Sequence, residues 1–255
     1  MDFWIPILLG VIQGITEFLP ISSSGHLVLC EYFFGLQGDF LFLNILLHIA
    51  TLLAVIIYYR KTIWYLITHP LCKMNIYLVI ATIPAVIFVL IFNNFVGNAM
   101  DNVLFVGVGF LMTALFLTTA VYISKKNTNP QPLNYKNVLV MGVSQAFAVF
   151  PGLSRSGTTL SFGLMAGAER QTALDFSFLM SIPIIIASLV YELIFADFST
   201  AFVDINIVGV TVAFITAFLT AILGLLIMKK LVKNMNLIYF VPYLVILGIL
   251  TIIFA

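Results

Sequence analysis

The sequence predicts an all-α integral membrane protein: an inverted-topology repeat with six transmembrane helices and two re-entrant helix-loop-helix hairpins. Three observations support this fold class: the composition, the lengths of the apolar stretches, and a broken motif that occurs twice. Of the 255 residues, 62% are hydrophobic and only 8% are charged, with a mean hydropathy of +1.17. A water-soluble domain does not bury that much apolar surface, so we expect the chain to lie in a membrane.

The charge and cysteine content exclude other classes. The chain has 11 Lys and Arg residues and a net charge of +1, whereas a nucleic-acid partner needs a concentrated basic face. No basic residue precedes Arg60, so we expect no cleaved signal peptide. Cys30 and Cys72 have no metal-ligand spacing and are expected to be buried free thiols.

Six apolar stretches are long enough to cross about 30 Å of hydrocarbon. They predict transmembrane helices at residues 40–59, 76–97, 102–124, 172–195, 204–228 and 237–254. Two further apolar stretches, residues 3–35 and 138–168, are interrupted midway by Pro, Gly and a run of hydroxyl residues. Such breaks free backbone groups that lipid cannot satisfy. Each stretch is therefore predicted to be a hairpin that is buried in protein or lines a wet cavity.

The two broken stretches are copies of one motif. A shift of 132 residues aligns GVIQGITEFLPISSSG (Gly10 to Gly25) with GVSQAFAVFPGLSRSG (Gly142 to Gly157), and seven of sixteen positions are identical. The same shift superimposes the predicted crossings of the two halves, so the repeat covers the whole chain. The predicted organisation is a single membrane domain over residues 1–255, with a first repeat at 1–124, a cytoplasmic linker at 125–137 and a second repeat at 138–255.

Each repeat contains one hairpin and three crossings, and the odd number of crossings inverts the second repeat. This topology places ten of the eleven basic residues on one side, which the positive-inside rule makes cytoplasmic. We therefore expect a multi-pass protein of the plasma (inner) membrane with its N-terminus outside. The first hairpin then enters from outside and the second from the cytoplasm. Their tips meet near the midplane, where half-helix N-termini favour an anion.

The eleventh basic residue, Arg155, lies at the predicted tip of the second hairpin, where a cation costs roughly 2.5–3.5 kcal/mol on insertion scales. An anion is therefore expected nearby. The flanking residues offer hydroxyls and close backbone approach, which suit phosphate oxygens, and are predicted to bind substrate: Ser154, Ser156, Gly157, Thr158 and Thr159. The alternative is a structural role, in which Arg155 only forms an ion pair with Glu17.

In the first hairpin, Gln13 and Glu17 are four residues apart and share one helix face near the tip. A carboxylate there can hold a divalent cation against a diphosphate, or orient a histidine base. The following residues place candidate nucleophiles within one turn of an imidazole: Ser22, Ser23, Ser24, Gly25 and His26. A lone histidine near a helix start is more often structural, but its convergence with Glu17 and Arg155 favours a functional site.

These residue types also predict the substrate class. An arginine, hydroxyls and helix ends suit a phosphate group, and a site reached through lipid-facing hairpins favours a substrate with an apolar tail. We therefore expect a lipid phosphate. His48, inside a predicted crossing, is instead expected to hydrogen-bond another helix.

Two long motifs, QGITEFLPISSSGH (Gln13 to His26) and PGLSRSGTT (Pro151 to Thr159), resemble the signature motifs of the undecaprenyl-diphosphate phosphatase family of the bacitracin-resistance type. The resemblance extends to LLHIATLLAV (Leu46 to Val55) and AGAERQTALDFSFLMSIP (Ala166 to Pro183), so it covers both halves. Every functional position of the family pattern is filled. Many members have Glu where this chain has Gln13, so Glu17 is the main carboxylate available to a metal.

The resemblance implies hydrolysis of undecaprenyl diphosphate to undecaprenyl phosphate at a site that opens to the extracytoplasmic face. That reaction recycles the lipid carrier for peptidoglycan and cell-wall synthesis and confers bacitracin resistance. A divalent cation, Mg²⁺ or Ca²⁺, is implied, with Glu17 and Gln13 as metal-binding residues. The implied catalytic residues are Glu17, Ser23, His26 and Arg155. Either Ser23 attacks with His26 as base, or His26 is itself the nucleophile.

The competing class is a transporter or flippase for a lipid phosphate, because inverted repeats with paired hairpins are also transporter architecture. Hydrolysis and flipping are able to coexist in one protein. The expected partners are therefore a polyprenyl diphosphate and the membrane lipid, with a homodimer left open.

Overall fold

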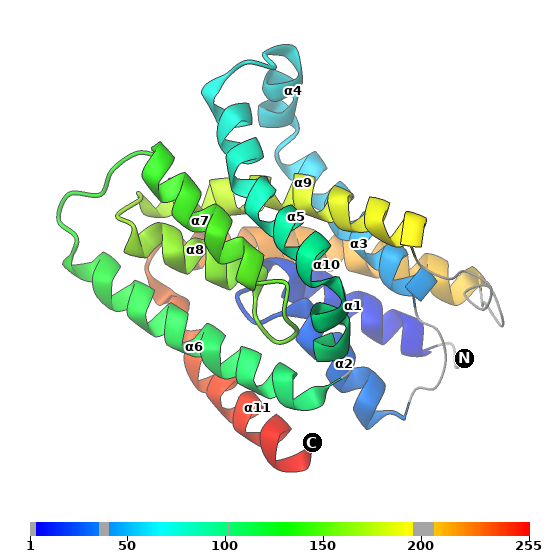
Figure 1. Cartoon of the computed structure of the whole chain (residues 1–255). Helices are drawn as coiled ribbons and strands as arrows, with labels where there is room; N and C mark the ends of the chain where they lie inside the picture. Colours follow the sequence, from blue (N-terminus) through cyan, green and yellow to red (C-terminus); the bar gives the residue numbers. More distant parts are fainter. Residues whose placement is uncertain (1–3, 36–40, 101, 196–206) are drawn as a thin grey trace.

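The computed structural model describes residues 4–35, 41–100, 102–195 and 207–255, and this part of the chain is almost entirely helical (Figure 1). Among the described residues, the only β pairing is an isolated bridge between Gln131 and Ala168. The predicted all-α class is therefore confirmed. In chain order the elements are α1 (Trp4–Phe18), α2 (Ser23–Phe33), α3 (Leu41–Tyr58), α4 (Arg60–Thr68), α5 (Lys73–Met100), α6 (Val103–Lys126), α7 (Tyr135–Phe147), α8 (Arg155–Met165), α9 (Arg170–Phe195), α10 (Ile207–Lys233), the 3-10 helix η1 (Asn236–Tyr239) and α11 (Phe240–Phe254).

Five helical stretches of the described chain are long and apolar enough to cross a membrane. They are α5, α6, α9, α10 and the continuous segment Asn236–Phe254, which joins η1 to α11. Helices α3 and α4 together make a sixth, although the chain bends by 82° between them. The protein is therefore a multi-pass membrane protein, and its long helices correspond to the six predicted crossings.

Helix α4 was not predicted, because the sequence prediction ended a crossing at residue 59 and began the next one at residue 76. The helix begins with Arg60 and Lys61 and exposes Trp64 and Tyr65. Basic and aromatic residues of this kind favour the boundary between lipid and water. The mixed composition of α4 explains why a search for continuous apolar stretches missed it.

Both broken stretches form hairpins, α1–α2 around residues 19–22 and α7–α8 around residues 148–154. The second helix of each hairpin begins at a serine cap. Ser22 Oγ accepts a hydrogen bond from the Gly25 amide at 3.3 Å, and Ser154 Oγ accepts one from the Gly157 amide at 3.1 Å. The shift of 132 residues relates Ser22 to Ser154 and Gly25 to Gly157. The two copies of the sequence motif therefore have the same local structure.

The break in the second hairpin depends on Gly152, whose φ of +78° lies in the left-handed region that favours glycine. A Cβ on Gly152 would lie 2.0 Å from the Val106 carbonyl oxygen of α6. Helix α6 meets this break through a glycine of its own, since a Cβ on Gly109 would lie 2.4 Å from the Pro151 carbonyl oxygen. The tip of the second hairpin is thus packed against α6 at backbone distance.

The first helix of each hairpin packs against a long helix of the other repeat, α1 against α10 and α7 against α5 (Figure 1). A Cβ on Gly10 would lie 2.4 Å from the Ala213 carbonyl oxygen, and a Cβ on Gly142 would lie 2.6 Å from the Ala81 Cα. The shift of 132 residues relates Gly10 to Gly142 and also Ala81 to Ala213. This close helix contact between the two halves therefore occurs twice, through small residues that allow close approach.

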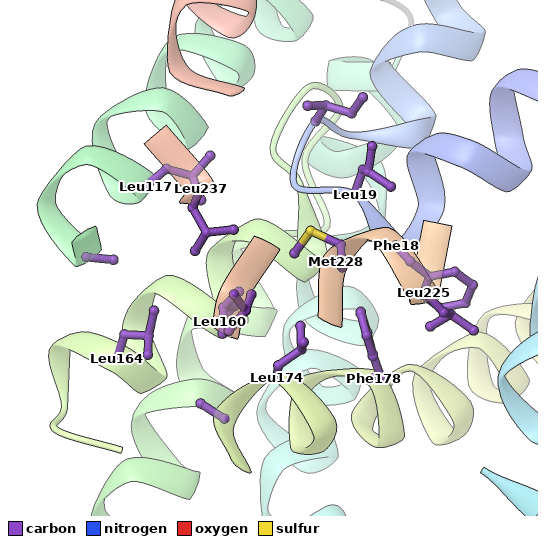
Figure 2. Close-up of a cluster of buried hydrophobic side chains, with 14 of the residues drawn as sticks. Phe18, Leu19, Leu117, Leu160, Leu164, Leu174, Phe178, Leu225, Met228 and Leu237 are labelled. Atoms are coloured by element: carbon purple, nitrogen blue, oxygen red, sulfur yellow. The ribbon is translucent and has the colours of Figure 1, made fainter. Parts of the chain in front are cut away.

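Both hairpins reach the main apolar core, which Figure 2 shows. Phe18 and Leu19 come from the tip of the first hairpin and Leu160 from the second. They pack with α9, where the Phe178 ring lies edge-on to the Phe18 ring at a centroid distance of 5.5 Å. The breaks in the two hairpins are consequently covered by protein, as their free backbone groups require.

Candidate active site

A cavity of about 740 Å³ lies beside the tips of both hairpins and extends between α3, α5 and α9. One part of its wall is polar and is supplied by the hairpins: Glu17, Ser22, Ser23, Ser24, Ser154 and Arg155. Much of the remaining wall is aliphatic, with Val86, Val89, Leu90, Ile184 and Ile185 among its residues. A concave site with a few convergent polar groups and an apolar extension suits a ligand with a charged head and a hydrocarbon tail.

The Glu17 carboxylate, 8% exposed, is the centre of the polar wall. Its Oε1 forms an ion pair with Arg155 Nη2. Its Oε2 accepts a 2.6 Å hydrogen bond from Ser23 Oγ and a 3.2 Å bond from Gln13 Nε2. The structure thus joins residues of both hairpins through one carboxylate. It also contains the ion pair on which the structural alternative for Arg155 rests.

The ion pair with Glu17 leaves other hydrogen-bond donors of the Arg155 guanidinium without a partner in the described part of the chain. Its Nη1 is buried and has no hydrogen-bond partner among the described residues, and the side chain lines the cavity. Arg155 is also the first residue of α8, where the helix dipole favours an anion. An unpaired buried donor costs roughly 1–3 kcal/mol. A guanidinium that lines a cavity with one amino group free is suited to bind a phosphate oxygen.

Several of the other hydroxyls predicted to bind phosphate form hydrogen bonds within the protein instead, and that of Ser156 joins the two hairpins. Ser156 Oγ donates to the Leu19 carbonyl at 3.0 Å, and Ser154 Oγ lies 3.2 Å from Ser156 Oγ. Thr159 Oγ1 donates to the Arg155 carbonyl and lies 2.6 Å from Ser177 Oγ of α9. Ser154 lines the cavity, whereas Ser156, Gly157, Thr158 and Thr159 do not. The predicted substrate contacts of these four residues stay predictions.

Several buried polar side-chain atoms of the hairpins also lack partners among the described residues: Gln145 Oε1, whose residue lines the cavity, and one atom each of Gln13 and Thr158. Gln13 Oε1 has no hydrogen-bond donor, and its Nε2 is identified as the nitrogen because it donates to a carboxylate. Thr158 Oγ1 is likewise buried and unpaired among the described groups. Buried polar groups without partners are few in proteins, so these two atoms have capacity for ordered water or a ligand, although neither Gln13 nor Thr158 lines the cavity.

His26 does not contact Ser23 in the structure, although the spacing allowed it. Its Nδ1 lies 2.6 Å from the Ser22 carbonyl oxygen, and its Nε2 lies 2.5 Å from Tyr243 Oη of α11. His26 is also absent from the cavity wall. Ser23 therefore has Glu17 as its direct partner, and the predicted pairing of Ser23 with His26 stays a prediction that requires the imidazole to move.

Several polar residues near the site were not predicted. Thr113 of α6 accepts a 3.0 Å hydrogen bond from the Ser154 amide and so supports the tip of the second hairpin. Glu192 lines the cavity from α9. His48 lines it from α3, where its Nδ1 lies 2.8 Å from the Asn44 carbonyl of its own helix and its ring interacts electrostatically with Glu192 of α9. An ionisable residue inside a crossing was the available signal for Glu192.

The fold and this site define a class of protein: a multi-pass membrane protein in which two hairpins from different halves of the chain build one polar site of carboxylate, arginine and serine. Comparison with known proteins identifies the family. A model of the bacitracin resistance protein family (BacA) matches residues 6–250. The chain belongs to this family.

Similar proteins cover the chain at substantial identity. Undecaprenyl-diphosphatase 4 of Bacillus thuringiensis subsp. konkukian (strain 97-27) is 43% identical over 74% of this chain and 73% of its own length. The undecaprenyl-diphosphatase of Christiangramia forsetii is 36% identical over 100% of this chain and 99% of its own length. The undecaprenyl-diphosphatase of Thermosipho africanus is 37% identical over 96% of this chain and 97% of its own length. The similarity therefore extends over both hairpins and the helices around them.

Proposed function

We propose that the protein hydrolyses undecaprenyl diphosphate to undecaprenyl phosphate and inorganic phosphate, and so recycles the lipid carrier for cell-wall synthesis and confers bacitracin resistance. The observation that carries this proposal is the shared carboxylate of Glu17. It holds Ser23 Oγ at 2.6 Å and forms an ion pair with Arg155, whose second amino group is free. A nucleophile, a base and an anion-binding group therefore lie together beside a cavity with an apolar wall.

In the proposed reaction, Ser23 Oγ attacks the terminal phosphorus of the diphosphate. The bond between that phosphorus and the bridging oxygen breaks, and undecaprenyl phosphate leaves with the bonding electron pair. Glu17 Oε2 accepts the hydroxyl proton through the hydrogen bond that it already receives from Ser23. Water then attacks the phosphoserine, which releases inorganic phosphate and restores the serine hydroxyl.

Arg155 has the electrostatic role in this proposal. Its free Nη1 binds an oxygen of the transferring phosphoryl group, where charge is spread during the reaction. The N-terminus of α8 adds backbone dipoles of the same sign. His26 remains the second candidate, as the nucleophile itself or as a base, and both roles require its Nε2 to leave Tyr243 Oη.

A divalent cation, Mg²⁺ or Ca²⁺, belongs to the proposal as an ion that arrives with the diphosphate. The described residues contain no group of three or more His, Cys, Asp or Glu side chains that could hold a metal. Mg²⁺ is, however, usually bound by one or two carboxylates together with substrate phosphates. Glu17 and the unpaired Gln13 Oε1 fit that smaller ligand set, and the cation would supply charge neutralisation at the phosphates.

We further propose that the site opens to the extracytoplasmic side of the plasma membrane and that the N-terminus lies outside. The support is the charge pattern, because ten of the eleven basic residues fall on one side of the predicted topology. The α1–α2 hairpin, which contains Ser23, then enters the membrane from the outer face.

The direct test uses the purified full chain in detergent with undecaprenyl diphosphate and Mg²⁺ or Ca²⁺. We expect release of one inorganic phosphate per lipid, with undecaprenyl phosphate as the lipid product. Glu17→Gln and Arg155→Ala are expected to lose this release, whereas the surface variant Lys126→Gln is expected to keep it. Absence of release from the wild-type protein, or full release from both site variants, would overturn the proposal.

The same preparation separates hydrolysis from transport. In liposomes, a lipid phosphate labelled on one leaflet would change leaflet without cleavage if the protein were only a flippase. That result, together with no phosphate release, would favour the transporter class. Leaflet exchange of the uncleaved lipid in addition to release would indicate that one protein performs both processes.

A further inference from the structure

Tyr243 of the last helix, α11, contacts the imidazole of His26, from which it is separated by 217 residues. Tyr243 Oη lies 2.5 Å from His26 Nε2. The two rings are stacked, with centroids 5.8 Å apart and planes that differ by 10°. Tyr243 lies outside both motifs that the sequence shares with its family, so neither motif predicted this contact.

The two nitrogen contacts of His26 define its tautomer. The Ser22 carbonyl oxygen can only accept, so the 2.6 Å contact places a proton on Nδ1. In the neutral ring Nε2 is then an acceptor, and the hydrogen bond at 2.5 Å runs from the Tyr243 hydroxyl to Nε2. The opposite tautomer would place two lone pairs in contact at the Ser22 carbonyl. The unprotonated nitrogen is the one that a base or a nucleophile requires.

Packing of the His26 ring against its neighbours does not by itself determine where Nε2 points. The Phe110 ring of α6 lies edge-on to the imidazole at a centroid distance of 5.3 Å, and it limits the ring plane without distinguishing the two nitrogens. The hydroxyl of Tyr243 is the only hydrogen-bond partner of Nε2 among the described residues. The Ser22 carbonyl sets the tautomer at Nδ1, and the Tyr243 hydroxyl sets the position and the hydrogen bonding of Nε2.

We propose that Tyr243 is a positioning residue for His26: its hydroxyl donates to the unprotonated Nε2 and holds the imidazole in place until the substrate replaces it as the partner of that nitrogen. The proposal deepens the proposed function and rests on the form of it in which His26, the second candidate, acts as base or nucleophile in phosphoryl transfer. It also makes the last helix of the second repeat a contributor to a group on the first hairpin.

The first test measures the histidine itself. The protein contains three histidines, His26, His48 and His69, and nitrogen NMR of ¹⁵N-histidine-labelled full chain distinguishes protonated from unprotonated ring nitrogens. Substitution of His48 or His69 assigns the signals. We expect an unprotonated Nε2 in the wild-type protein at neutral pH. In Tyr243→Phe, we expect the Nε2 signal to shift, because the unprotonated nitrogen loses the hydrogen bond from the Tyr243 hydroxyl.

The matched control is Tyr239→Phe, which removes a hydroxyl from η1 on a side chain that is 69% exposed. It should leave the His26 signals unchanged. Tyr243 is 44% exposed, so removal of its hydroxyl alone should preserve the fold, and a thermal unfolding curve checks this. Unchanged His26 signals in folded Tyr243→Phe would overturn the proposal, whether or not the protein hydrolyses a diphosphate.

The second test measures turnover. Loss of one hydrogen bond that orients a reacting group is expected to lower kcat about tenfold in Tyr243→Phe and to change KM by less than about twofold. Tyr239→Phe should keep the wild-type kcat. An unchanged or increased kcat in Tyr243→Phe would contradict the positioning role. Failure of the proposed function is distinct, because it would appear as no phosphate release from any variant.

Discussion

The buried Glu17 carboxylate accepts from three side chains, and each donor is of a different chemical type. Arg155 supplies charge, Ser23 a hydroxyl and Gln13 an amide. Removing one partner of a buried ion pair leaves the other charge uncompensated and typically costs about 3–5 kcal/mol. Variants at this position therefore change stability as well as chemistry, so stability has to be measured beside activity in each of them.

Arg155→Lys tests whether catalysis needs the second amino group of the guanidinium. Lysine keeps the positive charge but lacks the second amino group that is free in Arg155. We expect the charge to preserve the fold and kcat to fall by about 100-fold or more, since loss of one preorganised donor commonly costs that much. Steady-state phosphate release measures it. Arg170→Lys, at a site where the guanidinium binds Ser124, is the control, and equal kcat in the two variants would contradict the role of Arg155.

Ser23→Ala tests the nucleophile. The variant removes the hydroxyl that donates to Glu17 Oε2, and we expect kcat to fall about 1,000-fold. Ser24→Ala is the comparison, because Ser24 Oγ has its contact with Ser22 Oγ, and a loss of less than about tenfold is expected. Acid quenching with a substrate labelled on the terminal phosphate should trap an acid-stable phosphoserine at Ser23. An acid-labile adduct on His26 would instead make the imidazole the nucleophile.

At the scale of the helix, close approach through small residues sets the positions of the hairpins. Helix α1 lies against α10 at backbone distance, and α7 lies against α5 in the same manner. Apolar side chains gain little from leaving lipid for another helix, so such contacts depend on van der Waals packing and are sensitive to added volume. The half-helices carry Glu17 and Gln145 toward the cavity, and their packing therefore decides the geometry of the site.

Gly14→Ala tests this packing. A Cβ on Gly14 would lie 2.0 Å from Thr220 Oγ1 and 2.3 Å from the Ala217 carbonyl oxygen. The clash is expected to exceed the helix-propensity gain of alanine and to lower the free energy of unfolding by about 1–3 kcal/mol. Thermal or denaturant unfolding in detergent measures it. Gly97→Ala on α5 is the control, since a Cβ there meets nothing within 4 Å, and equal stability of the two variants would argue against tight α1–α10 packing.

At the scale of the whole molecule, much of the architecture was predictable because it depends on repeated patterns. The hairpins follow from Gly and Ser residues that recur at one offset, with a Pro at each break, and the structure places the serine caps where the alignment does. The Glu17–Arg155 ion pair between the hairpins was the structural alternative considered for Arg155, and it is present. These features leave a signal in sequence because several residues encode each of them.

Other parts depend on single residues in apolar helices and left no such signal. Tyr243 looks like an interfacial tyrosine until α11 is placed beside α2, and Thr113 looks like any helical threonine until it meets the Ser154 amide. At the 82° bend before α4, Tyr59 Oη donates to Asp175 of α9 at 2.6 Å, another contact between single residues far apart in the sequence. Sequence patterns do not predict a long-range contact that a single side chain makes.

Topology is the prediction that belongs to the whole molecule. With Cys30 and Cys72 replaced by serine, Asn102→Cys and Lys126→Cys place single thiols at opposite ends of α6. The charge pattern predicts that a membrane-impermeant maleimide applied to intact cells labels Asn102→Cys alone. Lys126→Cys should react only after the membrane is permeabilised. The reverse labelling pattern would contradict the orientation and place the Ser23 hairpin on the cytoplasmic face.

The central claim is that one site is built from both hairpins, and a double-mutant cycle on phosphate release tests it most directly. Glu17→Gln, Arg155→Gln and the double variant are compared with the wild-type kcat/KM, with unfolding curves to confirm that each is folded. If the two residues act as a unit, the double variant loses little more activity than the worse single variant. Losses that multiply in the double variant would show that Glu17 and Arg155 act independently and would contradict the account.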